Sequence, residues 1–186
     1  NPVPFVMELP NYRFPSAKSV VLLMWEKAKD FLTRAFTVIF MATVIIWFMQ
    51  TFDTRLNVVE NSADSILAAL GRLVSPIFAP LGFGDWRMVT ALVSGFTAKE
   101  AVVSTFGVIL GVSTEQLGIA LHSLFTTASA ASFLAFCLLY TPCVAAVSTI
   151  KTELKSGWKT VGIVFAQCLV AWLAAFMVYH VGLLLT

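Results

Sequence analysis

The sequence predicts an all-α protein that crosses a membrane several times. Of its 186 residues, 59% are hydrophobic and 12% are charged, whereas soluble domains carry roughly 25% charged residues. Its mean hydropathy is +0.87, and several nearly uncharged runs have the length that a helix needs to cross a bilayer, about 17 to 25 residues. The net charge of +2 is too small to indicate nucleic-acid binding, so we interpret the basic residues as flanks of membrane spans.

Residues 1–34 are predicted to be an extended segment followed by an interfacial amphipathic helix. Prolines recur through residues 1–15 and keep them out of regular helix. Beyond them, apolar residues recur at helical spacing opposite Lys18, Lys27 and Asp30, which predicts a helix at the membrane surface. Because the chain opens without an initiator Met or a signal-peptide pattern, we expect it to be a piece of a longer protein.

Residues 35–186 are predicted to be the transmembrane region. The first span, at about 35–52, is uncharged and close to the minimum of roughly 17 residues that crosses hydrocarbon. The stretch 66–83 is apolar but contains prolines and glycines, so a full crossing, a re-entrant hairpin and an interfacial segment all stay open. Carbonyls that proline frees must be buried in protein or line a cavity. The later elements are a short amphipathic piece and two runs long enough to span, at 115–124, 126–150 and 160–185.

The apolar stretch Met88–Thr114 contains charged residues only near its middle, at Lys99 and Glu100. A bare charge at the bilayer centre costs from a few to about 10 kcal/mol, so ionisable residues there usually face a bundle interior or a water-filled path. This placement predicts a role in transport. A structural ion pair or a snorkelling lysine is the alternative explanation.

If this stretch is one continuous helix, hydroxyl and small side chains share an arc with Glu100, among them Thr97 and Ser104. Such an arc indicates either close helix packing or a hydrated path, and the carboxylate favours the path. Lys99 points away from that arc on a continuous helix. It therefore needs a partner of its own, unless the helix unwinds near Gly95.

A second group of residues lies in the sequence LLYTPCVAAV, where Pro142 interrupts an uncharged run. Proline lacks an N–H, so it frees the carbonyl of Leu138 and opens the helix. Discontinuous helices recur at ion and substrate sites in membranes. The thiol of Cys143 beside exposed carbonyls suits a soft or borderline metal such as ferrous iron. A kink without chemistry is the simpler alternative.

Longer segments resemble the second half of the membrane domain of the bacterial ferrous iron transport protein B family. They are GFTAKEAVVST, preceded by APLGFGDWRMVTALVS, then LLYTPCVAAVSTIKTELKSGWK, and near the start FVMELPNYRFPS and WEKAKDFL. The resemblance implies a second gate-type repeat with its flanking helices, related to the repeats of nucleoside transporters. It also implies an N-terminal GTPase domain, a helical spacer and a first gate repeat outside this chain.

The resemblance further implies a multi-pass ferrous iron permease of the bacterial inner membrane that is not itself an enzyme. Fe²⁺ is then the transported ion, with no stably bound cofactor and with Cys143 on its path. Its expected partners are the lipid bilayer, the N-terminal half of the transporter and a second copy in a homo-oligomer. GTP acts only through the N-terminal domain, because this sequence lacks the phosphate-loop motif GxxxxGK[ST]. The resemblance carries over only Cys143. Position in the membrane adds Glu100 as a second transient Fe²⁺ contact and Lys99 in an ion-pair or gating role, and the remaining residues expected along the path are Thr97, Ser104, Thr141 and Pro142.

Three alternatives remain beside this interpretation: an ion-coupled nucleoside-type transporter, a membrane scaffold, and a thiol enzyme that pairs Cys143 with His122 or His180. No histidine stands at a short fixed spacing from Cys143, which argues against the enzyme, and a scaffold leaves Lys99 and Glu100 unexplained. The sequence also lacks CxxC and HExxH motifs and clustered histidines, which argues against a structural zinc or iron–sulfur site.

Overall fold

The computed structural model describes residues 16–141 and 143–185, with the side chains at 34, 35 and 114 left out. The regular elements in these ranges are helices, so the predicted all-α class is confirmed. The expected extended segment 1–15 and the predicted break at Pro142 itself lie outside the described residues. The chain divides into two compact units, Asn1–Arg34 and Ala35–Thr186, which are described separately.

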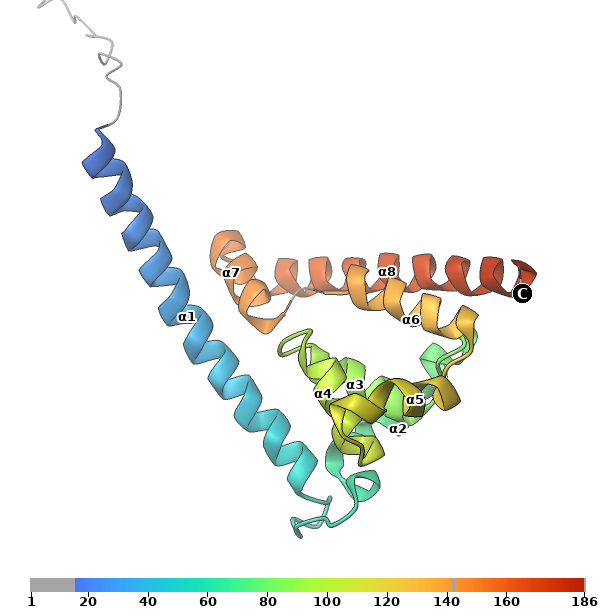
Figure 1. Ribbon diagram of the computed structural model, residues 1–186. Helices are drawn as coiled ribbons and strands as arrows, with labels where there is room; N and C mark the ends of the chain where they lie inside the picture. Colours follow the sequence, from blue (N-terminus) through green and yellow to red (C-terminus); the bar gives the residue numbers. More distant parts are fainter. Residues whose placement is uncertain (1–15, 142, 186) are drawn as a thin grey trace, which may run out of the picture. The chain divides into compact units, whose positions relative to one another are not determined.

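The longest helix, α1, runs from Ala17 to Thr51 and so begins in the first unit and ends in the second (Figure 1). Up to Thr33 its side chains are all exposed. No break in the helix separates the predicted interfacial stretch from the predicted first span.

The next helices form a sharply bent pair. The short 3-10 helix η1 (Ser62–Asp64) precedes α2 (Ile66–Phe78), which the 3-10 helix η2 (Ala79–Leu81) extends, and α3 (Trp86–Gly95) follows. Gly82 ends η2 with a φ of 81°, a left-handed conformation that glycine adopts without strain. The α2–η2 segment and α3 meet at 103°, which is the geometry of a broken span or a re-entrant loop.

A second bent pair follows. It consists of α4 (Ala101–Leu110) and α5 (Thr114–Leu124), whose axes differ by 80°. The α5 helix covers the short amphipathic piece that the sequence predicts. Contacts link α3 to α4 and α4 to α5, so the two bent pairs form one connected helical layer.

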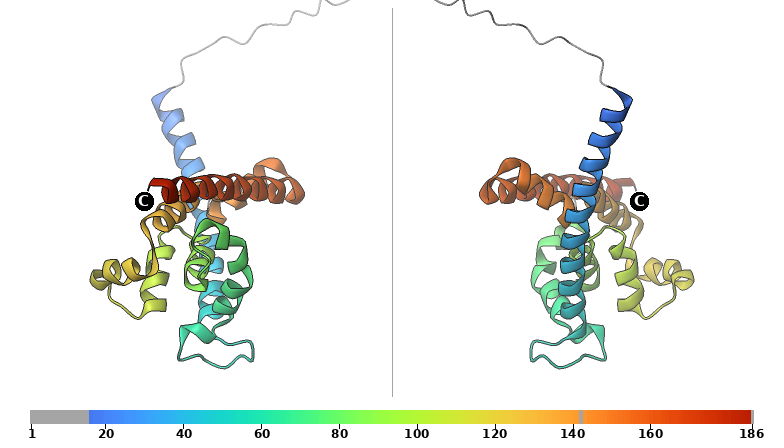
Figure 2. Two further views of the ribbon diagram at one scale, coloured as in Figure 1. Left: turned by 90° about the vertical axis from the view of Figure 1, so that its right-hand side faces the viewer. Right: turned by 90° about the vertical axis from the view of Figure 1, so that its left-hand side faces the viewer.

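The last elements are α6 (Thr127–Leu139), α7 (Val144–Leu154) and the long α8 (Gly157–Leu185). Helices α6 and α8 lie side by side and antiparallel (Figures 1 and 2). The buried hydroxyl of Ser132 in α6 donates to the carbonyl of Ala175 in α8 at 2.9 Å. This bond holds the two helices in register.

An aromatic core joins α6 to the bent pairs. The fully buried ring of Phe83 packs edge-on against Phe133 of α6, with ring centroids 5.3 Å apart. Phe133 also contacts Phe106 of α4 and Phe125 after α5, at 5.8 Å and 5.1 Å. Edge-to-face aromatic packing adds to apolar burial and fixes the relative placement of the elements.

Within the described residues, three helical stretches are long and apolar enough to cross a membrane: Ala17–Thr51, Thr127–Leu154 and Gly157–Leu185. The number rises to five if each bent pair is one span. The prediction of a multi-pass helical membrane protein with broken segments is therefore confirmed.

Candidate functional site at two helix breaks

The first break separates α3 from α4 and contains Lys99 and Glu100. The expectation of one continuous helix across Met88–Thr114 is therefore wrong, and the stated alternative, unwinding near Gly95, is what the structure has. The N–H of Phe96 still bonds the last carbonyls of α3, but the chain then turns and helical bonding resumes at Ala101. The side chain of Tyr140, the residue after α6, packs against Gly95, so tertiary contacts stabilise the break.

Because the helix is broken, Thr97, Glu100 and Ser104 do not share the predicted helical arc. The Thr97 hydroxyl is buried and donates to the carbonyl of Ser94 at 2.7 Å. Glu100 is exposed, directly precedes α4 and makes no side-chain bond to the helix end. Ser104 is also exposed, donates to its own helix at Ala101, and lines with Glu100 a hollow of about 480 Å³.

The second break separates α6 from α7 and holds Thr141 and Cys143. The buried hydroxyl of Thr141 faces α8, where it lies 3.3 Å from the carbonyl of Val164 and 3.1 Å from the sulfur of Cys168. Cys143 is half-buried and occupies the N-cap position of α7, with its thiol making no capping bond. Thr141 therefore fixes the break to α8, while the Cys143 thiol is left without a capping role.

The two breaks are in direct contact. The N–H of Val144, the residue after Cys143, donates to the carbonyl of Phe96 at 3.0 Å. From the other side, the Lys99 ammonium donates to the carbonyls of Cys137 and Leu138 at 3.0 Å and 3.2 Å. These three bonds link the α3–α4 break to the start of α7 and to the last turn of α6, on either side of the α6–α7 break.

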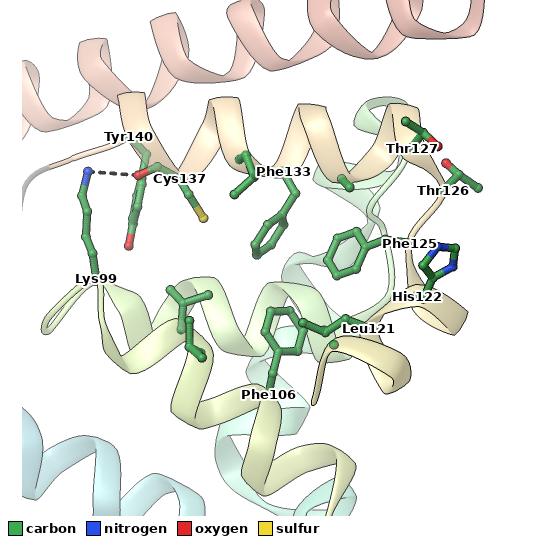
Figure 3. Close-up of a pocket in the computed structure, with 15 residues that line it drawn as sticks. Lys99, Phe106, Leu121, His122, Phe125, Thr126, Thr127, Phe133, Cys137 and Tyr140 are labelled. Carbon is green, nitrogen blue, oxygen red and sulfur yellow. Dashed lines mark hydrogen bonds between the residues drawn. The ribbon is translucent and has the colours of Figure 1, made fainter. Parts of the chain in front are cut away.

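Lys99 thus has a partner of its own, as the sequence predicted. Among the described residues, the recorded partners of its ammonium are backbone carbonyls and the ring of Tyr140, whose centroid lies 5.1 Å away, rather than a carboxylate (Figure 3). One of these carbonyls, at Leu138, is the group that Pro142 was predicted to free. A cation at the negative end of the α6 dipole is favourably placed.

An apolar cavity of about 470 Å³ lies beside the Lys99 contact, between α4, α5 and α6. Phenylalanines of the aromatic core and aliphatic side chains line it, with Lys99 and Tyr140 at one end and His122 at the other (Figure 3). Cys143 is not among its lining residues. His180 lies in α8, where a ring nitrogen is 2.9 Å from the carbonyl of Phe176.

Among the residues that the structure describes, no three His, Cys, Asp or Glu side chains come close enough to hold a metal ion together. Cys143 and Glu100 lie on neighbouring breaks, and an ion that contacts either of them would also draw on backbone carbonyls, hydroxyls or water. Such mixed ligation suits an ion that is bound weakly and then released.

Sequence reasoning missed two groups at this site. Tyr140 supplies the aromatic face beneath Lys99, and its position directly before the break in LLYTPC was the available signal. The carbonyl of Phe96 had no signal, because any residue carries that group.

Two known protein families match parts of this chain. The Gate family, described as nucleoside recognition, matches residues 32–157, and the family described as ferrous iron transport protein B C terminus matches residues 1–27. No solved structure matches the chain.

The chain is also similar to curated transporters. It is 40% identical over 180 residues to the Fe(2+) transporter FeoB of Staphylococcus aureus (strain COL), covering 96% of this chain and 27% of that protein. It is 32% identical over 192 residues to the Fe(2+) transporter FeoB of Methanocaldococcus jannaschii, covering 100% and 28% respectively. A Porphyromonas gingivalis Fe(2+) transport protein A/Fe(2+) transporter FeoB fusion protein is 31% identical over 231 residues, covering 98% and 27%. The chain thus spans little more than a quarter of the length of these relatives.

Proposed function

This chain belongs to the ferrous iron transport protein B family, and we propose that it forms part of a permease that moves Fe²⁺ across the bacterial inner membrane. In this proposal it is the second gate repeat. Its partner is the N-terminal half of the transporter, with the first gate repeat and the GTPase domain, and GTP acts only there. The relatives bear the names of Fe(2+) transporters, which does not favour a nucleoside-type transporter, a scaffold or a thiol enzyme.

The observation that carries the proposal is the contact between the two helix breaks. The hydrogen bond from Val144 to Phe96 brings the Cys143 backbone beside the unwound segment that contains Glu100. A thiolate, a carboxylate and unwound carbonyls are the kinds of ligand that a borderline divalent ion accepts. Helix ends and unwound backbone at a broken membrane helix are a recurrent place for such contacts.

The roles differ between the residues. Cys143 supplies the soft ligand, and the exposed Glu100 supplies negative charge at the neighbouring break. Thr97, Ser104 and Thr141 donate their hydroxyl protons to backbone carbonyls, which leaves their oxygens able to accept from water or face an ion. Fe²⁺ is the cargo here, and no cofactor stays bound.

The test measures whether Cys143 is reachable and whether iron competes for it. In the full-length transporter, a small membrane-permeant thiol reagent should modify Cys143 faster than Cys137 or Cys168, and Fe²⁺ supplied without oxygen should slow that reaction. Cys137 lines the apolar cavity and Cys168 lies against Thr141, so both serve as internal references.

Transport provides the second measurement. Cys143→Ser keeps the size of the side chain but weakens soft-metal binding, so Fe²⁺ uptake should fall at unchanged protein level. Cys168→Ser is the matched control and should leave uptake close to the parent. A Cys143 thiol that resists the reagent, together with full uptake by Cys143→Ser, would mean that the thiol only packs.

A further inference from the structure

The two carbonyls that Lys99 contacts lack any recorded backbone donor among the described residues. They belong to Cys137 and Leu138 in the last turn of α6, and within the described residues their hydrogen bonds come from the Lys99 ammonium. In a continued helix these carbonyls would accept from the N–H groups of residues 141 and 142. The Thr141 N–H makes no such bond and the proline at 142 has no N–H, so both oxygens are available to the Lys99 ammonium.

The groups around the ammonium are ones that bind cations in general. Carbonyl oxygens replace the hydration shell of monovalent ions in membrane proteins, and C-terminal ends of broken helices coordinate them. The helix dipole places partial negative charge at this end. The face of Tyr140 adds cation–π attraction, since its ring centroid lies 5.1 Å from the Lys99 nitrogen.

We propose that these carbonyls and the Tyr140 ring form a monovalent cation site, which the Lys99 ammonium fills as a tethered occupant. We call it the α6 carbonyl site: the carbonyl oxygens of Cys137 and Leu138 with the ring of Tyr140. When the Lys99 side chain is removed or moves away, the site takes a free K⁺ or Rb⁺ ion. The site is separate from Cys143 and does not depend on iron transport.

The geometry selects the class of ion. The nitrogen–oxygen distances of 3.0 Å and 3.2 Å match a large, weakly hydrated monovalent ion better than the shorter contacts that Na⁺ or a divalent ion makes. Hard divalent ions also require several anionic oxygens. The recorded contacts of the Lys99 ammonium include no carboxylate, and Glu100 lines a different hollow. Lys99, Cys137 and Tyr140 all border the cavity, so removal of the Lys99 side chain leaves space for an ion beside them.

Occupancy of this site bears on the contact between the two breaks. Lys99 belongs to the α3–α4 break and the carbonyls belong to α6, so the tethered cation ties one to the other. A free cation at the α6 carbonyl site would replace Lys99 there, so Lys99 would no longer bond to α6. Within the described residues, the bond from Val144 to Phe96 would then be the hydrogen bond that still joins the two breaks. Binding of a monovalent cation at the α6 carbonyl site would thereby affect how the α3–α4 break is held against α6.

The experiment compares thermal unfolding of the full-length protein in detergent with RbCl or choline chloride at equal ionic strength. Lys99→Met keeps the length of the side chain and removes the ammonium. In choline it should melt several degrees below the parent, and Rb⁺ should raise its melting temperature in a saturating manner. An ion bound with a Kd of about 10 mM would shift the unfolding equilibrium about elevenfold at roughly 100 mM.

Matched variants identify the source of the effect. Lys151→Met removes an exposed lysine of α7 and should respond to Rb⁺ no more than the parent, in which Lys99 fills the site. In the Lys99→Met background, Tyr140→Phe keeps the aromatic face and should retain the Rb⁺ response. Tyr140→Leu removes that face and should weaken the response.

Equal melting of Lys99→Met in Rb⁺ and choline would overturn the proposal. So would an equal Rb⁺ effect on the parent and on Lys99→Met, because the ion would then bind elsewhere. If Lys99→Met gives no monodisperse protein in either salt, Lys99→Gln takes its place. Its neutral amide can still donate to the carbonyls but leaves the helix end without a positive charge. The Lys99→Gln variant should therefore melt at a higher temperature in RbCl than in choline chloride. Equal melting temperatures in the two salts would again overturn the proposal.

Discussion

Replacing Gly95 with alanine tests the contact between the end of α3 and the end of α6. A Cβ at this position would overlap a methyl group of Val102 and lie 2.8 Å from the hydroxyl of Tyr140. The Val102 methyl can rotate away, but the Tyr140 ring is stacked on Phe136 with centroids 5.5 Å apart. The ring therefore moves only together with the end of α6, which carries the carbonyls that Lys99 contacts.

Two opposing terms set the size of the effect. Alanine is the better helix former by up to about 1 kcal/mol, and the gain is smaller at the last residue of a helix. Overpacking a close contact costs about 1–3 kcal/mol. We expect Gly95→Ala to lower the free energy of unfolding by about 1–2 kcal/mol and therefore to lower the melting temperature.

The measurement is thermal unfolding of the full-length protein in detergent, with Gly162→Ala as the control. Gly162 lies within α8, and a Cβ there meets nothing within 4 Å in this chain. It should therefore gain helix propensity without a clash and melt at or above the parent temperature. If Gly95→Ala melts as high as Gly162→Ala, the end of α3 does not pack against Tyr140 as described.

Two further predictions concern a charge and a hydrogen bond. Glu100→Gln should lower Fe²⁺ uptake at unchanged protein level, because it removes only the charge of an exposed side chain. Uptake is measured with radioactive iron, and normal uptake would mean that Glu100 has no part in the path. Ser132→Ala should lower the free energy of unfolding by about 0.6–1 kcal/mol, since its buried bond to the Ala175 carbonyl is lost. The control is Ser123→Ala, which loses only an exposed bond within α5. Equal melting temperatures for the two variants would contradict the assigned role of Ser132.

The sequence was sufficient for features that depend on neighbouring residues. Apolar runs of spanning length predicted helices that the structure has in α1, α6 with α7, and α8. The absent N–H of Pro142 predicted a free carbonyl at Leu138, and that carbonyl indeed bonds outside its own helix. Each of these inferences needs only residues within a few turns of one another.

Periodicity failed where it assumed an unbroken helix. The predicted arc through Thr97, Glu100 and Ser104 is valid only if helical geometry continues past Gly95, and it does not. Neither Gly95 nor Phe96 is a strong helix stop by itself, because isolated glycines are tolerated in helices. The break has partners elsewhere: the carbonyl of Phe96 bonds to the N–H of Val144.

By itself the sequence therefore determined that the chain is a multi-pass helical membrane protein and that Lys99 requires a partner if its helix continues, but not that the helix breaks after Gly95. Only the tertiary structure decided what that partner is. Lys99 and the carbonyl of Cys137 are 38 residues apart, and every residue carries a carbonyl, so no side-chain pattern marks this acceptor. The packing of aromatic rings on α6 brings that helix end to the first break, where a buried or lipid-facing carbonyl must find a donor.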